Sequence, residues 1–188
     1  MMEAAATCTV RAATPEDLPA VLELQARRHQ GGDEPRSASD LEGQTWMRMM
    51  RSENLTVYVG EVNGQIVGTA TLITVPNLTY DCAPTAFVEA FVVAVGHRRK
   101  GIATAIMRQL LRDARSAGCN KVQLLSHKRH ATDGAHRLYT SLGFEAEAEG
   151  FRLYLQQPPA AVHAAKLHSD YRAGALGSTE EPPRRACD

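Results

Sequence analysis

The N-terminal part of the chain carries one strand-like and one helix-like pattern of apolar positions. Residues 8–12 predict a short strand, and apolar residues at helical spacing predict a helix that runs to about residue 28. Thr14 suits the N-cap of this helix and Pro15 suits its first position. Asp17 places a negative charge where the helix dipole favours one, so the sequence fixes the start of this helix closely.

A second helix and a hairpin are expected next. Residues 29–39 contain two glycines, a proline and several charges, which indicates a loop, and Asp40 can cap the helix that follows. Residues 55–59 and 65–75 are rich in β-branched and apolar side chains. The Asn-Gly pair at 63–64 between them is a strong signal for a type I′ turn, because both turn residues there need positive φ.

The C-terminal half begins with the most apolar segment, residues 87–95, which we expect to be a strand buried on both faces. Two helix patterns follow, each ended by a glycine, the favoured residue just beyond a helix C-terminus. A strand separates these helices, and an antiparallel pair of strands is expected to close the sheet. In chain order these elements are the helix 101–117, the strand 121–127, the helix 135–142 and the strands 144–146 and 151–155.

The predicted order, β-α-α-β-β-β-α-β-α-β-β, contains no internal repeat. After Gln157 the composition shifts to alanine and proline with few large apolar residues. We therefore expect a folded domain over residues 1–156 and a flexible C-terminal extension over residues 157–188.

The composition narrows the class of protein. The 188 residues are 44% apolar and 22% charged, as in ordinary globular proteins, and the formal net charge is zero. This balance argues against a nucleic-acid partner, and no apolar run is long enough to span a bilayer. The start does not resemble a secretory signal, and the four cysteines (Cys8, Cys82, Cys119 and Cys187) are scattered. We therefore expect a cytoplasmic protein with reduced thiols, no metal and no membrane partner.

One segment carries a clear binding chemistry. The apolar strand that includes Phe91 runs into a basic turn at residues 97–100, and the turn opens directly into a helix. A helix start leaves N–H groups unpaired and carries partial positive charge. Gly101 and Ala103 keep side chains away from this backbone, and Thr104 can add a hydroxyl donor. The segment predicts a site for a diphosphate; neither a Walker loop nor a Rossmann fingerprint is present.

Arg98-x-x-Gly101-x-Ala103 resembles the R/Q-x-x-G-x-G/A motif of the GNAT superfamily of N-acetyltransferases. The resemblance covers roughly residues 8–155 and includes the LYTSLGF block around Tyr139. It implies the GNAT fold, an α/β (α+β) domain whose central, mixed, mostly antiparallel twisted sheet is splayed at the cofactor strand and flanked by about four helices. Two positions depart from the family pattern: Val95 replaces a common proline, and Ala103 replaces the second glycine.

The resemblance also implies how acetyl-CoA, the cosubstrate, is bound. The main chain of residues 91–93 would hydrogen-bond the pantetheine arm, provided that this strand parts from its neighbour near Ala94. Residues 99–104 would hold the pyrophosphate. The expected cofactor-binding residues are Phe91, Val92, Val93, Arg98, Arg99, Lys100, Gly101, Ile102, Ala103 and Thr104.

Acetyl transfer requires a neutral amine, a stabilised oxyanion and a proton for the leaving thiolate. By resemblance Tyr139 donates that proton; the alternative is a tyrosine that only packs in the core. Glu89 lies where similar enzymes often use an acid as the base, and the alternative is a carboxylate paired with a neighbouring strand. The oxyanion donor would be a main-chain N–H near Val93. Thr132 stands where many relatives carry an asparagine, which puts a pantetheine contact there in doubt.

The acceptor amine is the least specified part of the prediction. Its pocket is expected from residues 29–39, 77–84 and 147–151, with His127 and His130 either lining it or lying on the surface. The central block resembles small-molecule N-acetyltransferases, which implies direct transfer to a small primary amine in a ternary complex. A peptide or protein N-terminus as acceptor and a non-catalytic acyl-CoA sensor are the alternatives, and a homodimer is open.

Overall fold

The computed structural model describes residues 8–29, 37–127, 134–151, 153 and 155 of the chain. Within them, five strands form one sheet and four α-helices accompany it. The strands are β1 (Thr9–Ala12), β2 (Leu55–Val62), β3 (Gln65–Val75), β4 (Thr85–Val93) and β5 (Lys121–Leu124). The helices are α1 (Leu18–His29), α2 (Asp40–Met50), α3 (Ile102–Ser116) and α4 (Ala135–Ser141), with 3-10 turns at η1 (Pro15–Asp17) and η2 (Val95–His97).

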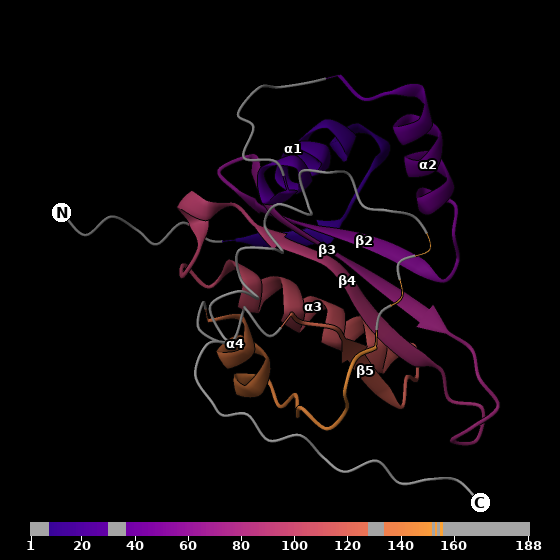
Figure 1. Cartoon of the computed structure of the whole chain (residues 1–188). Coiled ribbons are helices and arrows are strands. Elements are labelled where there is room, and N and C mark those ends of the chain that lie inside the picture. The colour runs from indigo at the N-terminus through magenta and orange to yellow at the C-terminus, as the bar shows by residue number, and fades with distance from the viewer. Residues whose placement is uncertain (1–7, 30–36, 128–133, 152, 154, 156–188) are drawn as a thin grey trace, which may run out of the picture. The chain divides into compact units, whose positions relative to one another are not determined.

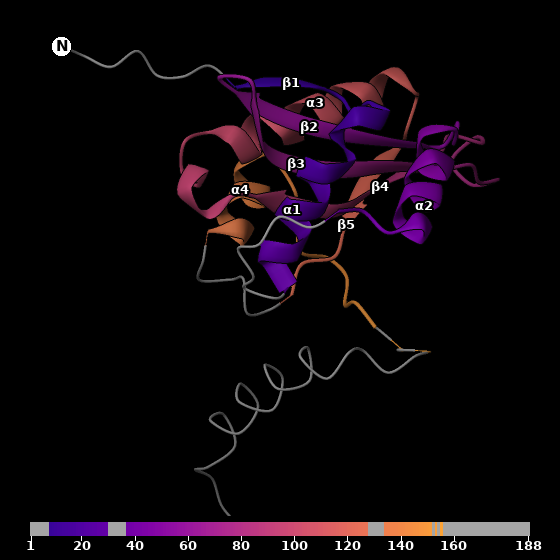
Figure 2. The ribbon, with the colours of Figure 1, turned by 90° about the horizontal axis from the view of Figure 1, so that it is seen from above.

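The sheet has the order β1-β2-β3-β4-β5 and is covered on both faces. Strands β1 to β4 are antiparallel neighbours, whereas β5 runs parallel to β4. Helices α1 and α2 lie on one face and α3 and α4 on the other (Figure 1), and the view from above shows α1 crossing the middle of the sheet (Figure 2). The expected mixed, mostly antiparallel sheet with about four flanking helices is therefore confirmed. None of the described helices is both long enough and apolar enough to cross a membrane.

Helix α3 makes the larger core. Its side chains Ile106, Met107 and Leu110 are fully buried against the sheet. Glycine at position 68 of β3 permits this contact, because a Cβ there would stand 2.7 Å from the Ile106 Cδ1 atom. The Tyr58 hydroxyl donates to the Asp113 carboxylate at 2.6 Å and ties β2 to the same helix. Burial, together with this carboxylate, raises the pKa of Tyr58 far above its ordinary value. The Tyr58 hydroxyl therefore stays protonated and remains the donor of this hydrogen bond.

A second, smaller core lies on the opposite face, where Trp46 of α2 packs with Val21, Val57 and Val59. Its edge is fixed by Asp17, which is buried at the start of the first helix. The carboxylate accepts from two nitrogens of Arg11 at 2.6 and 3.0 Å and from the Thr14 N–H at 2.7 Å. The Arg11 guanidinium is the main reason why the pKa of Asp17 lies below its ordinary value. Thr14 is the N-cap, as predicted, but it starts the 3-10 turn η1, and the α-helix itself begins only at Leu18.

Two sequence predictions about element ends are corrected. Ser39, rather than Asp40, caps α2: its hydroxyl accepts from the Glu42 N–H, and the Glu42 carboxylate accepts from the Ser39 N–H at 2.9 Å. The strand expected over residues 87–95 starts at Thr85 and ends at Val93, and it is not buried on both faces. The Phe87 side chain alternates with the core residues Ala86 and Val88, so it faces away from α3, and it is 37% exposed.

The closing pair of strands is also absent from the described residues. Residues 144–146 are not a strand, because the Phe144 N–H donates to the Tyr139 carbonyl at 3.0 Å and completes the C-terminal cap of α4. Gly143, with φ of 87°, makes that reversal possible and turns Phe144 toward the core. Residues 151, 153 and 155 are not in a strand either, and the extension proposed for residues 157–188 lies outside the described residues.

Replacing Asp17 with asparagine is expected to lower the free energy of unfolding at pH 7 by about 1.5–3 kcal/mol, because the bonds to Arg11 lose their charge. A carboxylate with a lowered folded pKa stabilises the protein above its unfolded pKa of about 3.9 and loses this contribution as the pH falls through the folded value. The difference between Asp17→Asn and the wild type should therefore shrink between pH 7 and about pH 2.

Urea unfolding at the two pH values measures this difference, with Glu16→Gln, exposed in the same turn, as the matched control. A difference that is as large at pH 2 as at pH 7 would contradict the assignment.

Candidate functional site

The candidate site is built around an irregularity in β4. Thr69 of β3 pairs with Val92 and Thr71 pairs with Glu89, so two β4 residues, Ala90 and Phe91, stand opposite one β3 residue. This is a β-bulge. Ala90 has φ of 51°, in the left-handed region that costs a residue with a Cβ roughly 1–2 kcal/mol.

The bulge changes which side chains of β4 face α3. Before it, Ala86 and Val88 belong to the core under α3; after it, Phe91 and Val93 pack against that same core. In a regular strand the alternation would have turned Phe91 and Val93 to the other face. The bulge therefore lets the end of β4 contribute two large apolar side chains to the core while its main chain is rotated at Ala90.

Strand β4 also extends beyond the end of its neighbour β5. The parallel pairing of the two strands ends at Val88 and Leu124, where β5 stops. Among the described residues, residues 89–93 therefore have no strand partner on that side, and we call them the unpaired stretch of β4. The sequence placed the parting near Ala94. The parting from β5 occurs earlier, because β5 is only four residues long. On its other side the chain does not part from β3 at Ala94, since the Ala94 N–H donates to the Val67 carbonyl at 2.8 Å.

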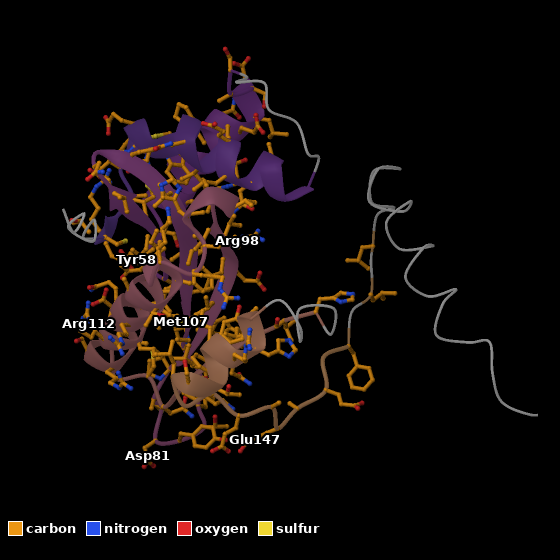
Figure 3. The ribbon with its side chains drawn as sticks, turned by 90° about the vertical axis from the view of Figure 1, so that its left-hand side faces the viewer. Tyr58, Asp81, Arg98, Met107, Arg112 and Glu147 are labelled. Carbon is orange, nitrogen blue, oxygen red and sulfur yellow. The ribbon has the colours of Figure 1, made fainter. Side chains whose placement is uncertain are left out.

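The basic turn follows directly. Figure 3 views the protein from the side of this turn and labels Arg98. The Arg98 Nε donates to the Val93 carbonyl at 3.3 Å, which folds this side chain back over the end of β4. Arg99 has φ of 63° and Gly101 has φ of 82°, so the turn enters the left-handed region twice before α3 begins. Arg98, Arg99 and Lys100 are exposed, so their charges are accessible to an anion.

The start of α3 supplies main-chain donors rather than side chains. Gly101 is the N-cap, and a Cβ built on it would meet nothing within 4 Å, so open space lies beside this backbone. Ile102 is buried in the core and can offer only its N–H, while Ala103 and Thr104 are half-buried. A helix start with an open approach and three adjacent cationic side chains is a favourable place for a diphosphate.

The two expected catalytic residues lie on different faces of the sheet. Tyr139 of α4 packs against the core under α3, with its ring 6.0 Å from the Phe144 ring in an edge-to-face arrangement. Glu89 alternates with the core residue Val88, so it points to the face of α1 and α2, where it is exposed. Glu89 is the first residue of the unpaired stretch of β4, whereas Tyr139 packs against the same core as Phe91 and Val93, which lie in that stretch.

Two polar side chains that the sequence analysis did not single out attach flanking helices to β4 and to the segment that follows β5. The Gln25 amide of α1 donates to the Ala90 carbonyl at 3.2 Å, and His136 of α4 lies 3.1 Å through its Nε2 from the Ser126 hydroxyl. His136 is three residues before Tyr139, a spacing that places both on one side of the helix and was visible in the sequence. No sequence pattern links Gln25 to Ala90.

Of the expected acceptor-side residues, His127 is exposed, whereas His130 and Thr132 lie outside the described residues. The 77–84 loop is held by the Asn77 side chain, whose amide donates to the Ala83 carbonyl at 3.1 Å. Within the described residues, no three His, Cys, Asp or Glu side chains gather as a metal site would require.

Comparison with known protein families gives one match that covers most of the chain. The family model described as "Acetyltransferase (GNAT) family" matches residues 18–144. This range starts at the first residue of α1 and ends at Phe144, so it contains β4, the basic turn, α3 and α4.

Individual proteins agree with the family match. A glucosamine 6-phosphate N-acetyltransferase of Trypanosoma brucei brucei is 31% identical over 139 residues, which cover 74% of this chain and 90% of that protein. A solved structure of a putative acetyltransferase from Agrobacterium tumefaciens str. C58 is 34% identical with a TM-score of 0.69, covering 78% of this chain and 99% of that one. An aminoglycoside N-acetyltransferase solved in complex with CoA has a TM-score of 0.63 at 17% identity, over 81% and 97% of the two chains, and shares the fold.

Proposed function

The chain belongs to the GNAT family of acetyltransferases, and from this membership we propose that it transfers the acetyl group of acetyl-CoA to a primary amine of a small molecule. The observation that carries the proposal is the unpaired stretch of β4, which leads through the basic turn into the open N-terminus of α3. This arrangement offers an extended main-chain edge followed by a cationic anion site. Acetyl-CoA has the matching groups in the same order: the amides of its pantetheine arm can pair with the main-chain edge, and its pyrophosphate can bind at the cationic site.

In the proposed complex, the pyrophosphate is bound by the N–H groups at Gly101 to Thr104 and by the charges of Arg99 and Lys100. Arg98 is bonded to the Val93 carbonyl, so it contributes mainly by closing the turn and by its charge. The pantetheine amides pair with the main chain of residues 91–93. The thioester then lies along β4, where the side chains of Glu89 and Tyr139 flank it from the two faces of the sheet.

The placement on two faces suits direct attack. We assign the approach of the amine to the face of Glu89, which takes a proton from the amine directly or through water. The thiolate leaves on the face of Tyr139, whose hydroxyl gives it a proton. A main-chain N–H near Val93 stabilises the oxyanion that forms between these events. Proton removal and proton delivery are thereby kept apart by the strand itself.

A small amine as acceptor is supported by the relatives. The Trypanosoma relative is named for glucosamine 6-phosphate, an amino sugar, and the aminoglycoside enzyme shares the fold. The purified protein, acetyl-CoA and a panel of small primary amines that includes glucosamine 6-phosphate should release CoA thiol well above the rate without amine. Because Cys82 is exposed, thiol release is read at low enzyme concentration against an amine-free blank.

A peptide array assayed in the same way tests the alternative class of acceptor. Release with peptides and none with the small amines would contradict the proposed substrate class, and binding of acetyl-CoA without release on either panel would contradict catalysis.

Replacing Gly101 with glutamate is expected to abolish acetyl-CoA binding measured by calorimetry. The substitution puts a carboxylate into the open space beside the helix N-terminus, where the pyrophosphate is proposed to bind. Gly118→Glu is the matched control, since Gly118 also has positive φ (71°) and open space at its Cβ but follows the other end of α3. Equal loss of binding in both variants would argue for a general effect of strain or charge and against this site.

Replacing Tyr139 with phenylalanine is expected to lower kcat by about 10²–10⁴-fold while the Kd of acetyl-CoA stays within about threefold. Phenylalanine keeps the ring that packs on Phe144 and removes only the hydroxyl. Thr140→Val, which removes an exposed hydroxyl from the next position of α4, serves as the control and should leave kcat unchanged. An unchanged kcat for Tyr139→Phe would reduce Tyr139 to a packing residue.

A further inference from the structure

The bulge at Ala90 is held in a conformation that its own residue disfavours. Its φ of 51° is one that glycine adopts freely and that alanine does not, because the Cβ is crowded. A bulge of this kind usually places glycine at the left-handed position. With alanine there, the conformation persists only if the surroundings stabilise it.

Gln25 supplies such a contact. In a regular strand the Ala90 carbonyl would bond to a neighbouring strand, but at the bulge it accepts from the Gln25 side chain at 3.2 Å. Gln25 is half-buried on α1, a helix that packs over β3 and β4. The donor therefore comes from an element that is already fixed against the sheet, which gives the bond a definite direction.

The direction of this bond determines the direction of the next peptide N–H. The peptide unit between Ala90 and Phe91 is planar and trans, so its N–H points opposite to its carbonyl. With the Ala90 carbonyl held toward α1, the Phe91 N–H is directed away from that helix. Phe91 is the first residue of the main-chain segment to which we assign the pantetheine arm.

We propose that Gln25 is a positioning residue that holds the Ala90 bulge and, through it, sets the main-chain groups of residues 91–93 that receive acetyl-CoA. This inference rests on the proposed function and adds a residue outside the cofactor-binding segment to it. Gln25 acts without touching the cosubstrate. Its removal weakens acetyl-CoA binding, and replacement of Ala90 by glycine makes the contact dispensable.

A double-mutant cycle tests the proposal by calorimetry with acetyl-CoA. Gln25→Met keeps the length of the side chain and removes its donor, and it is expected to raise the Kd about tenfold in the wild-type background. In the Ala90→Gly background, where positive φ carries no penalty, the same change should raise the Kd by less than about threefold. Gln44→Met, at an exposed glutamine of α2, is the matched control and should leave the Kd unchanged.

Two results would overturn the proposal: a Kd of Gln25→Met equal to that of the wild type, or a tenfold rise in both backgrounds, which would reduce Gln25 to a packing residue. Hydrogen exchange of the 85–94 segment in the free protein separates this outcome from failure of the proposed function. Faster exchange at residues 89–93 in Gln25→Met, and not in Gln44→Met, shows that Gln25 holds the Ala90 bulge even in a protein that binds no acetyl-CoA. Unchanged exchange contradicts it.

Discussion

The β-bulge at Ala90 is the constraint on which the rest of the site depends. By inserting one extra residue into β4, it reverses which side chains face α3, so that Phe91 and Val93 join the same core as Ala86 and Val88. The strand can then be anchored by its side chains at both ends. Its main chain is thereby fixed in position beyond Val88, where β5 no longer pairs with it.

One part of helix α3 is buried and its N-terminus is exposed, and each part has a different role. Its length is buried against the sheet through Ile106, Met107 and Leu110, while its N-terminus at Gly101 faces open space. The buried part fixes the direction of the helix, and the exposed end keeps unpaired N–H groups and the positive end of the dipole accessible. Because glycines in β2 and β3 let the helix approach the sheet closely, the N-terminus of α3 is held in place by the core as well as by the turn.

The separation of Glu89 and Tyr139 by the strand gives the proposed chemistry a physical order. In the proposed reaction Glu89 acts from the face of α1 and α2, and Tyr139 acts from the face of α3 and α4. The polar contacts from flanking helices attach α1 to β4, through Gln25 and Ala90, and α4 to the segment after β5, through His136 and Ser126.

The sequence by itself determined the four helices and the five strands of the described residues, because these depend on neighbours along the chain. The anion site at the basic turn remains a prediction. The Thr14 cap, the Asn63-Gly64 turn and the run from Arg98 to Gly101 are local signals, and the structure places each element within a few residues of its prediction. The family resemblance added Tyr139 and Glu89, whose roles remain predictions.

Only the tertiary structure decided where the sheet opens, which face each catalytic candidate occupies and where the chain stops being a strand. The apolar run from Phe87 to Val93 looks like a regular buried strand, since a bulge at an alanine leaves no mark in a hydrophobic pattern. The pairing of Ala90 with Gln25 joins residues 65 positions apart. Phe144 looked like the start of a strand, yet it completes the cap of α4, because its N–H finds the Tyr139 carbonyl once Gly143 has reversed the chain. The bulge and its contact with Gln25 depend on residues that are distant in sequence. The end of α4 depends on whether Phe144 pairs with another strand or with the Tyr139 carbonyl, and only the fold decides between the two.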